Sequence, residues 1–539
     1  MQLITTTLLF TILPHVLADW QYLSRPDLSP PRLNVTVPAK SSTENGYIFI
    51  SPSPGFAPDS VGPSQPGAYI FRDDGDLVWS GVGYLAGNIA NFGPTVIHGK
   101  PVLKAAQGWL IGSHGRMYGN QAVLDQNYET LKIVRAAGHR LVSVHEFEVV
   151  DGGRSVLVET PVPVPFDLRG FGGEDGQEWI LSSGFQEIDI ETGELLFEWF
   201  SLDHISPKYS ALPLQQTGPF NAYNSEDAWD YFHLNSAAKD RDGNYLISAR
   251  NYAAIFKING TSGEVIWQLG GSHGSDFKVP SNAQFAFQHD ARIRYISDDG
   301  LIERISFFDN ADHSQLEPGH GIGGSSRARY VELNHVAGTV REIQTFWAPD
   351  GLVANSQGNA QFLPGGNVFV NWGQAGAVTE FSPDGEVLFH AYLDSYPNSH
   401  VQSYRGFRSS WTGYSGEDVA VLALGDSSGE VVVYVSWNGD TETDVWRFYL
   451  VNVETGAESK YLGEKKKKAG FETEFRVSLD LSSEALGRVF VAAEALDREG
   501  RIMGRSRVTG LSDKTSYTSH LGSGSLAIED MEEQARLEL

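Results

Sequence analysis

The chain has 539 residues, and 41% of them are hydrophobic, a share that supports a sizeable core. Its formal net charge of −27 argues against nucleic acid and anionic membrane surfaces as partners, because both call for a basic protein surface. Cysteine is absent, which rules out disulfides, thiolate metal ligands and cysteine nucleophiles. With 58 glycines and 12% aromatic residues, the composition favours β-strands joined by tight turns.

The N-terminal residues 1–18, MQLITTTLLFTILPHVLA, are typical of a secretory signal peptide. An apolar stretch leads to Val16-Leu17-Ala18, which has small or short side chains at the two positions that signal peptidase reads. Two sequons make Asn34 and Asn259 expected glycosylation sites on a eukaryotic secretory route. The sequence therefore predicts a secreted, extracellular protein. No later stretch has 18 consecutive apolar residues, so we expect no membrane-spanning helix.

One hairpin pattern, an apolar strand, a polar turn and a second apolar strand, recurs six times in the first 400 residues. The copies are residues 69–79, 122–134, 186–199, 256–269, 331–344 and 378–390. Five turns carry a glycine, which permits a positive φ, whereas the second copy has Thr130 at that place. The turn glycines are Gly75, Gly193, Gly263, Gly338 and Gly385.

A second type of hairpin alternates with the first and also joins two apolar strands through a turn that contains glycine. It occurs at residues 96–105, 145–159, 233–249, 289–306 and 360–372. Two hairpins make one four-stranded unit, and units of about sixty residues are compatible with the blades of a propeller. The pattern predicts an all-β fold in which residues 19–415 form a six-bladed β-propeller.

The C-terminal part of the chain has a different pattern. From Val419 onward, short alternating strands at close spacing predict a small β-sandwich over residues 416–510. The polar residues 511–539 are expected to be a disordered tail or a short exposed helix. The run Lys465–Lys468 is interpreted as part of an exposed turn.

Three histidines open the second type of hairpin in three consecutive units. They are His145, His233 and His289. Because a propeller gathers its innermost strands around a central channel, we expect the three imidazoles to converge on one pocket. Asn235 follows His233 by two residues and would share its strand face, and Arg250 ends the paired strand of the same hairpin.

The segment AFQHDARI (286–293) has the alternation of a β-strand. This alternation would place His289 on the same face as Phe287, with Asp290 and Arg292 on the opposite face. A histidine that occurs alone on a β-strand is more often a structural core residue than a catalytic one. Asp290 and Arg292 are expected to form a structural pair.

The set of imidazoles, carboxamide and guanidinium suits a tetrahedral oxyanion, because arginine offers a fork of donors to which asparagine and histidine add others. Neutral imidazole can also attack an electrophilic centre and form a covalent intermediate. Three histidines could instead bind zinc. Arg250 would repel a divalent cation, and no short-spaced pair of ligands occurs, so we expect neither a metal nor another cofactor.

Several separated motifs resemble the arylsulfotransferase (ASST-type) family, in particular its fungal secreted branch. They are DYFHLNSAAKDRDGNYLISARNYAAIFKINGTSGEVIWQLGG (230–271), FQHDARI, FDN (308–310), GNAQFLPGGNVFVNWG (358–373) and YRGFRSSWTG (404–413). The resemblance covers most of residues 40–415. It implies a six-bladed propeller that moves a sulfuryl group between phenols without a nucleotide sulfate donor. In bacterial members of the family a histidine is transiently sulfated in a ping-pong cycle.

The resemblance also implies roles for single residues. His289 would be the sulfated nucleophile, and His145 would complete the ring and protonate the leaving phenolate. His233, Asn235 and Arg250 would hold the sulfate oxygens and stabilise the transition state. A further hydroxyl contact is expected from a later blade, for which the candidates are Ser356, Gln357 and Asn359.

Two other functions stay open on the residues alone. The same pocket could serve fungal secondary metabolism and steer an isomerisation or cyclisation of a phenolic or polyketide-like compound, with histidines as general acid or base. The chain could also be a non-catalytic secreted binding module with the sandwich as its interaction domain. For the arylsulfotransferase function, the expected partner is a small phenolic substrate. The sequence does not indicate an oligomeric state.

Overall fold

The computed structural model describes residues 19–56, 60, 62–311, 324–393, 401–426, 428–451, 458–467, 470–479 and 489–514. The expected signal peptide and residues 515–539 of the expected tail lie outside this part of the chain. Antiparallel pairing dominates the sheets, and the helices whose full extent is described are three-residue 3-10 turns. The predicted all-β class is thus confirmed. None of the described helices has the length and apolar character needed to cross a bilayer.

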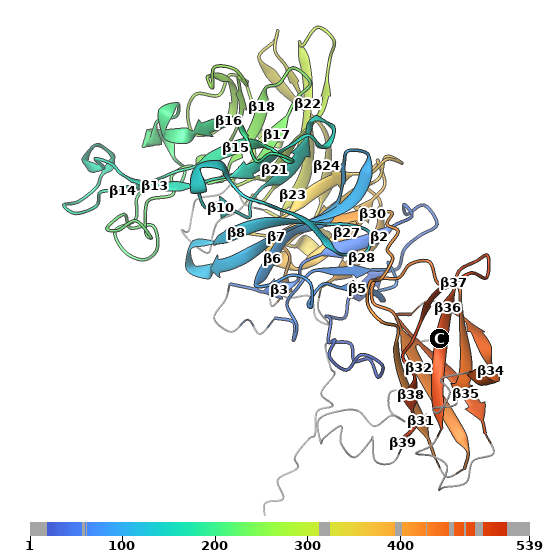
Figure 1. Cartoon of the computed structure of the whole chain (residues 1–539). Coiled ribbons are helices and arrows are strands. Elements are labelled where there is room, and N and C mark those ends of the chain that lie inside the picture. Colours follow the sequence, from blue (N-terminus) through green and yellow to red (C-terminus); the bar gives the residue numbers. More distant parts are fainter. Residues whose placement is uncertain are drawn as a thin grey trace, which may run out of the picture.

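Six sheets of four or five strands lie between Asn34 and Ser409, and we name them A to F in chain order (Figure 1). Sheet A contains β30 (Gly406–Ser409), β2 (Tyr47–Ile50), β4 (Tyr69–Phe71) and β5 (Leu77–Ser80). Sheet B contains β6 (Asn88–Ile97), β7 (Lys100–Ile111) and β8 (Arg116–Leu124), with β9 (Thr130–Val134) and β10 (Val142–Ser143) both paired to β8. Sheet C contains β11 (Phe147–Val150), β12 (Ser155–Glu159), β15 (Gly184–Asp189) and β16 (Leu195–Phe200).

The other three sheets repeat this arrangement. Sheet D contains β17 (Leu234–Lys239), β18 (Tyr245–Ala249), β19 (Ala254–Ile258) and β20 (Val265–Gly270). Sheet E contains β21 (His289–Ile296), β22 (Ile302–Asp309), β23 (Arg327–Asn334) and β24 (Thr339–Trp347). Sheet F contains β25 (Asn359–Phe362), β26 (Val368–Asn371), β27 (Ala377–Phe381), β28 (Val387–Tyr392) and β1 (Asn34–Val37).

Short elements connect and extend these sheets. Two further strand pairs lie outside sheets A to F. Strand β3 (Ser53–Pro54) pairs with β29 (Val401–Gln402), and β13 (Val162–Pro165) pairs with β14 (Trp179–Ser182). The pair of β13 and β14 projects from the body of the molecule in Figure 1. The 3-10 turns are η1 (Gly112–His114), η2 (Ala137–His139), η3 (Asp151–Gly153), η4 (Arg169–Phe171), η5 (Ser201–Asp203), η6 (Pro207–Tyr209), η7 (Arg250–Tyr252), η8 (Ser281–Ala283), η9 (Pro349–Gly351) and η10 (Gly373–Ala375).

Each of the six sheets shares a cluster of buried apolar side chains with the next sheet. On β2 the side chain of Ile48 packs in the cluster shared with sheet F, and its neighbour Phe49 packs in the cluster shared with sheet B. Successive side chains of a strand point to opposite faces, so one strand can serve both clusters. Equivalent clusters join B to C, C to D, D to E and E to F. The packing order therefore runs round in a circle.

Sheet A closes this circle, because it combines strands from both ends of the region. Strand β30 pairs with β2 in a register from Tyr47 opposite Ser409 to Ile50 opposite Gly406. The buried Arg408 of β30 donates to the main-chain oxygen of Glu44 at 2.6 Å and forms ion pairs with Asp73 and Glu380 at 2.8 and 3.1 Å. The closure is therefore held by ladder hydrogen bonds, apolar packing and a buried guanidinium.

The recurring hairpins are the two outer strands of sheets A to E and strands β27 and β28 of sheet F, where β1 pairs outside β28. Their five turn glycines all have positive φ. In the second copy the left-handed residue is Tyr128, with φ of +66°, and not a residue at position 130. A tyrosine is needed there because its hydroxyl donates to the main-chain oxygen of Gly439 at 2.7 Å, in the C-terminal part of the chain. Gly439 itself has φ of +88°, and a Cβ atom there would lie 2.3 Å from the Tyr128 ring.

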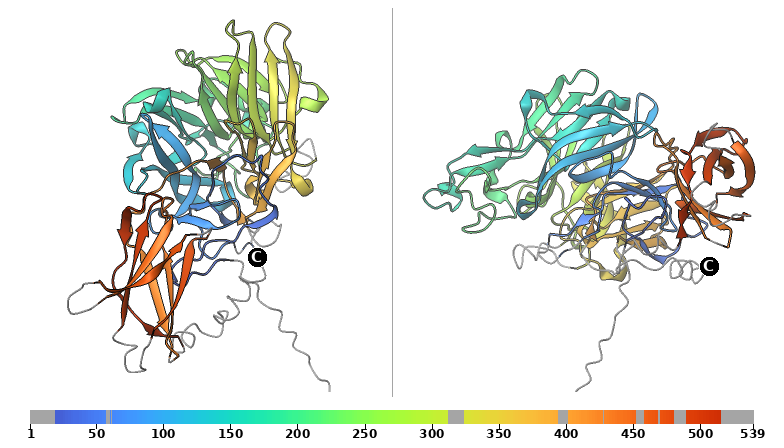
Figure 2. Two further views of the ribbon diagram at one scale, coloured as in Figure 1. Left: turned by 90° about the vertical axis from the view of Figure 1, so that its right-hand side faces the viewer. Right: turned by 60° about the horizontal axis from the view of Figure 1, so that its bottom comes forward.

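The C-terminal strands form a separate unit beside the other sheets (Figures 1 and 2). One sheet contains β31 (Ala420–Gly425), β32 (Glu430–Ser436), β35 (Glu472–Ser478) and β39 (Ser512–Asp513). The other contains β33 (Val445–Val451), β34 (Glu458–Lys466), β36 (Phe490–Leu496), β37 (Ile502–Arg505) and β38 (Thr509–Gly510). Both sheets contribute to one buried cluster that includes Val433 and Trp446. Strand pairing here extends past residue 510, where the sequence pattern placed the end of this unit.

A buried cluster of charges joins several sheets near the centre of the circle. Glu146, which precedes β11, is 0% exposed and forms ion pairs with Arg292 at 2.8 Å and Arg405 at 2.9 Å. Arg405 also donates to the main-chain oxygen of Asn235 at 3.0 Å. Asp290 pairs with Arg292 at 2.8 Å, so the predicted structural pair is confirmed. Despite burial, the two guanidinium groups hold the pKa of Glu146 well below its usual value.

We expect Arg405→Leu to destabilise the chain by about 3–5 kcal/mol, because it leaves the Glu146 carboxylate buried with one of its two cations removed. The midpoint of urea unfolding measures this change. The matched control is Arg501→Leu, which removes an exposed ion pair with Asp497 and should leave the midpoint unchanged. Equal midpoints for the two variants would contradict a central role of the charge cluster.

Candidate active site

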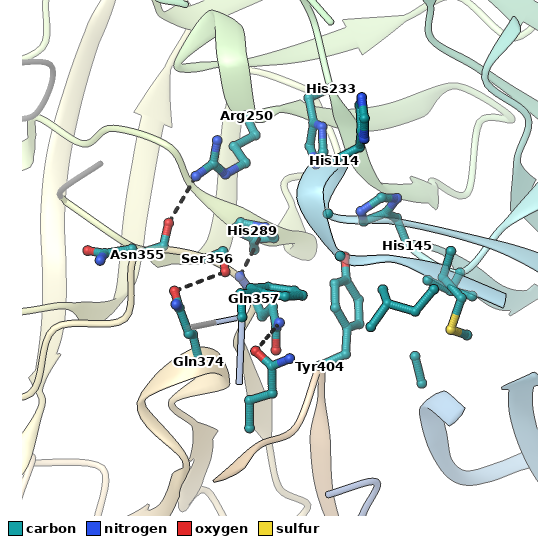
Figure 3. Close-up of a pocket in the computed structure, with 18 of the residues that line it drawn as sticks. His114, His145, His233, Arg250, His289, Asn355, Ser356, Gln357, Gln374 and Tyr404 are labelled. Atoms are coloured by element: carbon teal, nitrogen blue, oxygen red, sulfur yellow. Dashed lines mark hydrogen bonds between the residues drawn. The ribbon is translucent and has the colours of Figure 1, made fainter. Parts of the chain in front are cut away.

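A cavity of about 570 Å³ lies where the first strands of the six sheets begin. Its wall includes residues that precede or start β30, β6, β11, β17, β21 and β25. Figure 3 shows how the polar side chains gather around it. These polar residues include His145, His233, Arg250, His289, Ser356 and Gln357. Apolar side chains form another part of the wall, among them Ala90, Leu110, Met117, Val144 and Phe220.

His289 is the first residue of β21, and its imidazole is 2% exposed. Its Nδ1 lies 2.7 Å from the Oδ1 atom of Asn310, and its Nε2 accepts a hydrogen bond from the main-chain N–H of Gln357 at 3.2 Å. Burial, and then the nearby Arg250 guanidinium, lower the pKa of His289 well below its usual value. The ring is therefore neutral at physiological pH, as a nitrogen nucleophile must be.

The hydrogen bonds of Asn310 decide which ring nitrogen of His289 carries the proton. Its Nδ2 donates to the main-chain oxygens of Ala354 at 2.7 Å and Gln357 at 3.1 Å. Because two carbonyls fix the amide group in this orientation, Oδ1 faces the imidazole and must accept from Nδ1–H. The lone pair of the neutral ring is consequently on Nε2.

The other two histidines each have a carboxylate behind Nδ1. His145 Nδ1 lies 2.7 Å from Glu159 and His233 Nδ1 lies 2.7 Å from Asp230. The two rings contact each other edge to face, with centroids 4.8 Å apart. Within the described residues, neither Nε2 atom has a hydrogen-bond partner in the protein. An imidazole whose Nε2 is available to a ligand can act as a general acid or base, and the carboxylate on Nδ1 fixes the orientation of the ring.

Arg250 is the first residue of η7, directly after β18, and its main-chain N–H donates to the oxygen of His233. Arg250 thus lies beside His233, at the end of the strand that pairs with β17. Its guanidinium donates to the main-chain oxygen of Asn355 at 2.9 Å and to the Asn251 side chain at 2.8 Å. Burial lowers the pKa of Arg250 to about 10, so the group stays charged at neutral pH. It provides a positive charge in the cavity wall.

Asn235 does not line the cavity, in contrast to the expectation. Its side chain is 0% exposed, and its Nδ2 donates to the main-chain oxygen of Gln288 at 2.7 Å. The expected alternation fails because His233 has φ of +53° and the pairing of β17 shifts between Leu234 and Ser236. Asn235 therefore supports the residue that precedes His289.

Alternation also fails around His289. Phe287 and Asp290 both have positive φ, of 54° and 55°, and the register of β21 shifts between His289 and Arg292. Phe287 precedes the strand, so it does not share a strand face with His289. Left-handed conformations of residues other than glycine cost energy and concentrate at functional sites, which agrees with a site at this position.

The structure places two of the three candidates for the expected hydroxyl contact in the cavity wall. Ser356 and Gln357 line the cavity. Asn359 lies on β25 and exchanges two hydrogen bonds with the main chain of Gly406, outside the cavity. Neither expected glycosylation position belongs to the cavity wall: Asn34 lies on the edge strand β1, and Asn259 lies in the turn between β19 and β20.

Sequence reasoning missed several residues of the cavity, of which His114 and Tyr404 are the largest polar ones. His114 lies in η1 and bonds to Asp227 at 2.8 Å, which joins the β7–β8 hairpin to the loop before β17. Tyr404 lies 5.5 Å from His145, centroid to centroid. Neither position belongs to the hairpin repeat, and the only available signal was the motif YRGF. The described residues contain no group of three or more His, Asp or Glu side chains arranged to hold a metal ion.

We expect Asp230→Asn to lower the pKa of His233. Burial lowers this pKa and the Asp230 carboxylate counteracts the effect, so its removal should let His233 lose its proton at a lower pH. NMR titration of the His233 ring protons measures the change. Asp242→Asn, in the exposed turn of the same hairpin, is the control and should not shift the titration. An unchanged pKa in Asp230→Asn would contradict the coupling.

Solved structures that resemble the chain include two with weak similarity. A protein of unknown function from Bacteroides caccae is 10% identical, covers 68% of this chain and 99% of its own, and has a TM-score of 0.37. AztD from Citrobacter koseri is 9% identical, covers 68% of this chain and 98% of its own, and has a TM-score of 0.26. Scores this low support no conclusion about function. None of the curated proteins matches the chain.

The family comparison is more informative. The model of the arylsulfotransferase (ASST) family matches residues 93–393, which is more than half of the chain. The matched range contains the three histidines, Arg250 and Asn310 of the cavity described above. The chain therefore belongs to the arylsulfotransferase (ASST) family.

Proposed function

We propose that the chain transfers a sulfuryl group from an aryl sulfate to a phenolic acceptor, without a nucleotide donor, through a sulfated His289. The observation that carries the proposal is the state of His289, a buried neutral imidazole whose Nε2 holds the lone pair and whose ring lies near the charged Arg250. Family membership supports arylsulfotransferase-like chemistry in general. The nucleophile, the intermediate and the substrates are our proposal.

In the first half of the reaction, Nε2 of His289 attacks the sulfur atom, and the bond between sulfur and the aryl oxygen breaks. The electron pair of that bond leaves with the oxygen, which takes a proton from His145 or His233. Arg250 offsets the negative charge on the three sulfuryl oxygens, and its burial strengthens the interaction. The attack replaces the hydrogen bond that Gln357 donates to Nε2 in the free protein.

In the second half, a phenol enters the cavity and gives its proton to the histidine that lost one. Its oxygen attacks sulfur, the bond between sulfur and Nε2 breaks, and His289 recovers its lone pair. Donor and acceptor are both phenol derivatives, so one apolar wall can hold the aromatic ring of each in turn. Ala90, Leu110, Met117 and Val144 offer such a wall.

We also propose a fold description in which sheets A to F are the blades of a six-bladed β-propeller over residues 19–415. The circular packing order and the closure of sheet A by strands from both ends support it. The shared core of the two C-terminal sheets supports a β-sandwich for the second unit. Limited proteolysis that separates the two units into stable fragments would test the boundary near residue 416.

Export through the secretory route, with cleavage after Ala18 and glycosylation at Asn34 and Asn259, remains part of the proposal. N-terminal sequencing of the protein from culture medium should begin at Asp19. Retention of the first 18 residues would contradict it.

We expect purified protein to release nitrophenolate from p-nitrophenyl sulfate only when a phenol is present as acceptor. Without acceptor, mass spectrometry should find one added sulfuryl group on the peptide that contains His289. His289→Ala should abolish both signals, because the remaining side chains offer no equivalent nucleophile at that place. The matched control is His98→Asn, which changes an exposed histidine with a positive φ of 50° and should keep full activity.

Turnover retained by His289→Ala, or an adduct on another residue, would refute the proposed nucleophile. If no aryl sulfate in a broad panel reacts or forms an adduct, the site would instead fit acid–base chemistry on a phenolic compound. The next measurement would then be binding of such compounds to the cavity.

We expect Arg250→Met to lower the rate constant of His289 sulfation about 10²- to 10³-fold, because charge stabilisation at the sulfuryl oxygens is lost. Arg250→Lys should recover part of the rate. Single-turnover release of nitrophenolate measures this step. Arg241→Met, an exposed arginine of the same sheet, is the control. A raised KM with an unchanged rate constant would show that Arg250 only binds the substrate.

A further inference from the structure

We propose that Asn310 is a positioning residue that keeps a proton on His289 Nδ1 throughout the cycle, and that its lack of charge keeps the sulfated ring cationic and reactive. This inference deepens the proposed function and rests on it. It concerns Asn310, the hydrogen-bond partner of Nδ1 on the side of the His289 ring opposite Nε2. In the proposed reaction Asn310 does not touch the substrate.

Asn310 is held in one orientation by contacts on every side. It follows β22 directly and is 0% exposed. Besides the two bonds from its Nδ2 to Ala354 and Gln357, its main-chain oxygen accepts from the Ser326 hydroxyl at 3.1 Å. Rotating the amide by 180° would point Oδ1 at two carbonyl oxygens, which is unfavourable for all three groups. The acceptor for His289 Nδ1–H is therefore always an amide oxygen.

The partner of His289 differs from those of its two neighbours. His145 and His233 have carboxylates, Glu159 and Asp230, at the same 2.7 Å distance from Nδ1. A carboxylate can take the proton from Nδ1, whereas the Asn310 amide oxygen is far too weak a base to do so. We infer that His145 and His233, with carboxylate partners, can exchange protons, whereas His289, with an amide partner, keeps its proton on Nδ1.

The consequence lies in the charge of the intermediate. Before reaction the ring is neutral, with a proton on Nδ1 and a lone pair on Nε2. When Nε2 forms its bond to sulfur, the ring keeps the Nδ1 proton and becomes an imidazolium that carries the sulfuryl group. When the acceptor oxygen attacks, the bond from nitrogen to sulfur breaks and its electron pair returns to Nε2. The leaving group is then neutral imidazole.

A carboxylate in place of the amide would change the second half of the cycle. Sulfation makes Nδ1–H more acidic, so the proton would pass to the carboxylate and leave a neutral sulfo-imidazole. Its leaving group would be an imidazolate anion, unless the proton returned first. We therefore infer that a neutral partner makes the sulfated enzyme a better sulfuryl donor.

The first test removes the acceptor with Asn310→Ala. In ¹⁵N NMR of the free protein with labelled histidine, Nε2 of His289 should give the signal of an unprotonated nitrogen in the wild type. In Asn310→Ala the protonated form of Nε2 should gain population, and sulfation should slow by about tenfold or more. A wild-type ring with its proton on Nε2 overturns the inference, whether or not the protein transfers sulfuryl groups.

The second test introduces the charge with Asn310→Asp. After sulfation with p-nitrophenyl sulfate and removal of the donor, the lifetime of the adduct on His289 is measured with a phenol as acceptor. The two carbonyl oxygens near this position raise the pKa of an introduced carboxyl group, which is neutral at low pH and charged at high pH. The adduct should therefore live about tenfold longer as pH rises through that pKa.

Asn359→Asp is the matched control, because it places the same change at a buried asparagine outside the cavity. Its adduct should decay at the wild-type rate at every pH. Equal adduct lifetimes in Asn310→Asp and wild type, across pH values at which both are sulfated, would overturn the inference while the proposed function stands. Absence of any adduct in the wild type would refute the proposed function, and the NMR measurement would still decide where the proton lies.

Discussion

The ion pairs of Glu146 are the interaction on which the rest of this structure depends. A buried carboxylate is costly unless cations and hydrogen bonds surround it, and here Arg292 and Arg405 meet it from different sheets. Arg405 belongs to the segment that closes the circle, and Arg292 belongs to β21, the strand that begins with His289. The same ion pairs therefore neutralise the buried Glu146 carboxylate and hold the strands that carry the site in place. Moving any of these sheets would expose an uncompensated charge.

The site above this cluster shows how one residue type acquires different chemistry. His145, His233 and His289 lie at equivalent places in neighbouring sheets, yet their partners on Nδ1 are two carboxylates and one amide. In the proposed reaction, the charge of this partner, burial and the neighbouring Arg250 guanidinium would distinguish the nucleophile His289 from the two proton carriers. His233 itself and Asp290, directly after His289, have left-handed φ, so the backbone departs from regular strand geometry at two of these histidines.

Much of the fold was readable from the sequence, because turn glycines and alternating strands are local signals. The six recurring hairpins all correspond to paired neighbouring strands of sheets A to F, and they are the outer strands in sheets A to E. Alternation failed at Asn235 and Phe287, where positive φ values and register shifts change the direction of side chains. Asn310 and Tyr404 were present in the motifs FDN and YRGF, but their roles depend on contacts across the circle. Such contacts leave no trace in local periodicity.

The pairing of β2 with β30 also has a consequence for how the chain folds. Arg408 bonds to Glu44, 364 positions earlier, so the first sheet stays incomplete until nearly the whole of this region has been synthesised. During that time β2 presents an unpaired edge, a common starting point for aggregation. The ring can assemble only after translation has passed β30, and a chain that ends before this strand would lack the partner of β2. Synthesis of β30, the last strand of sheets A to F, thus controls when the edge of β2 can be protected.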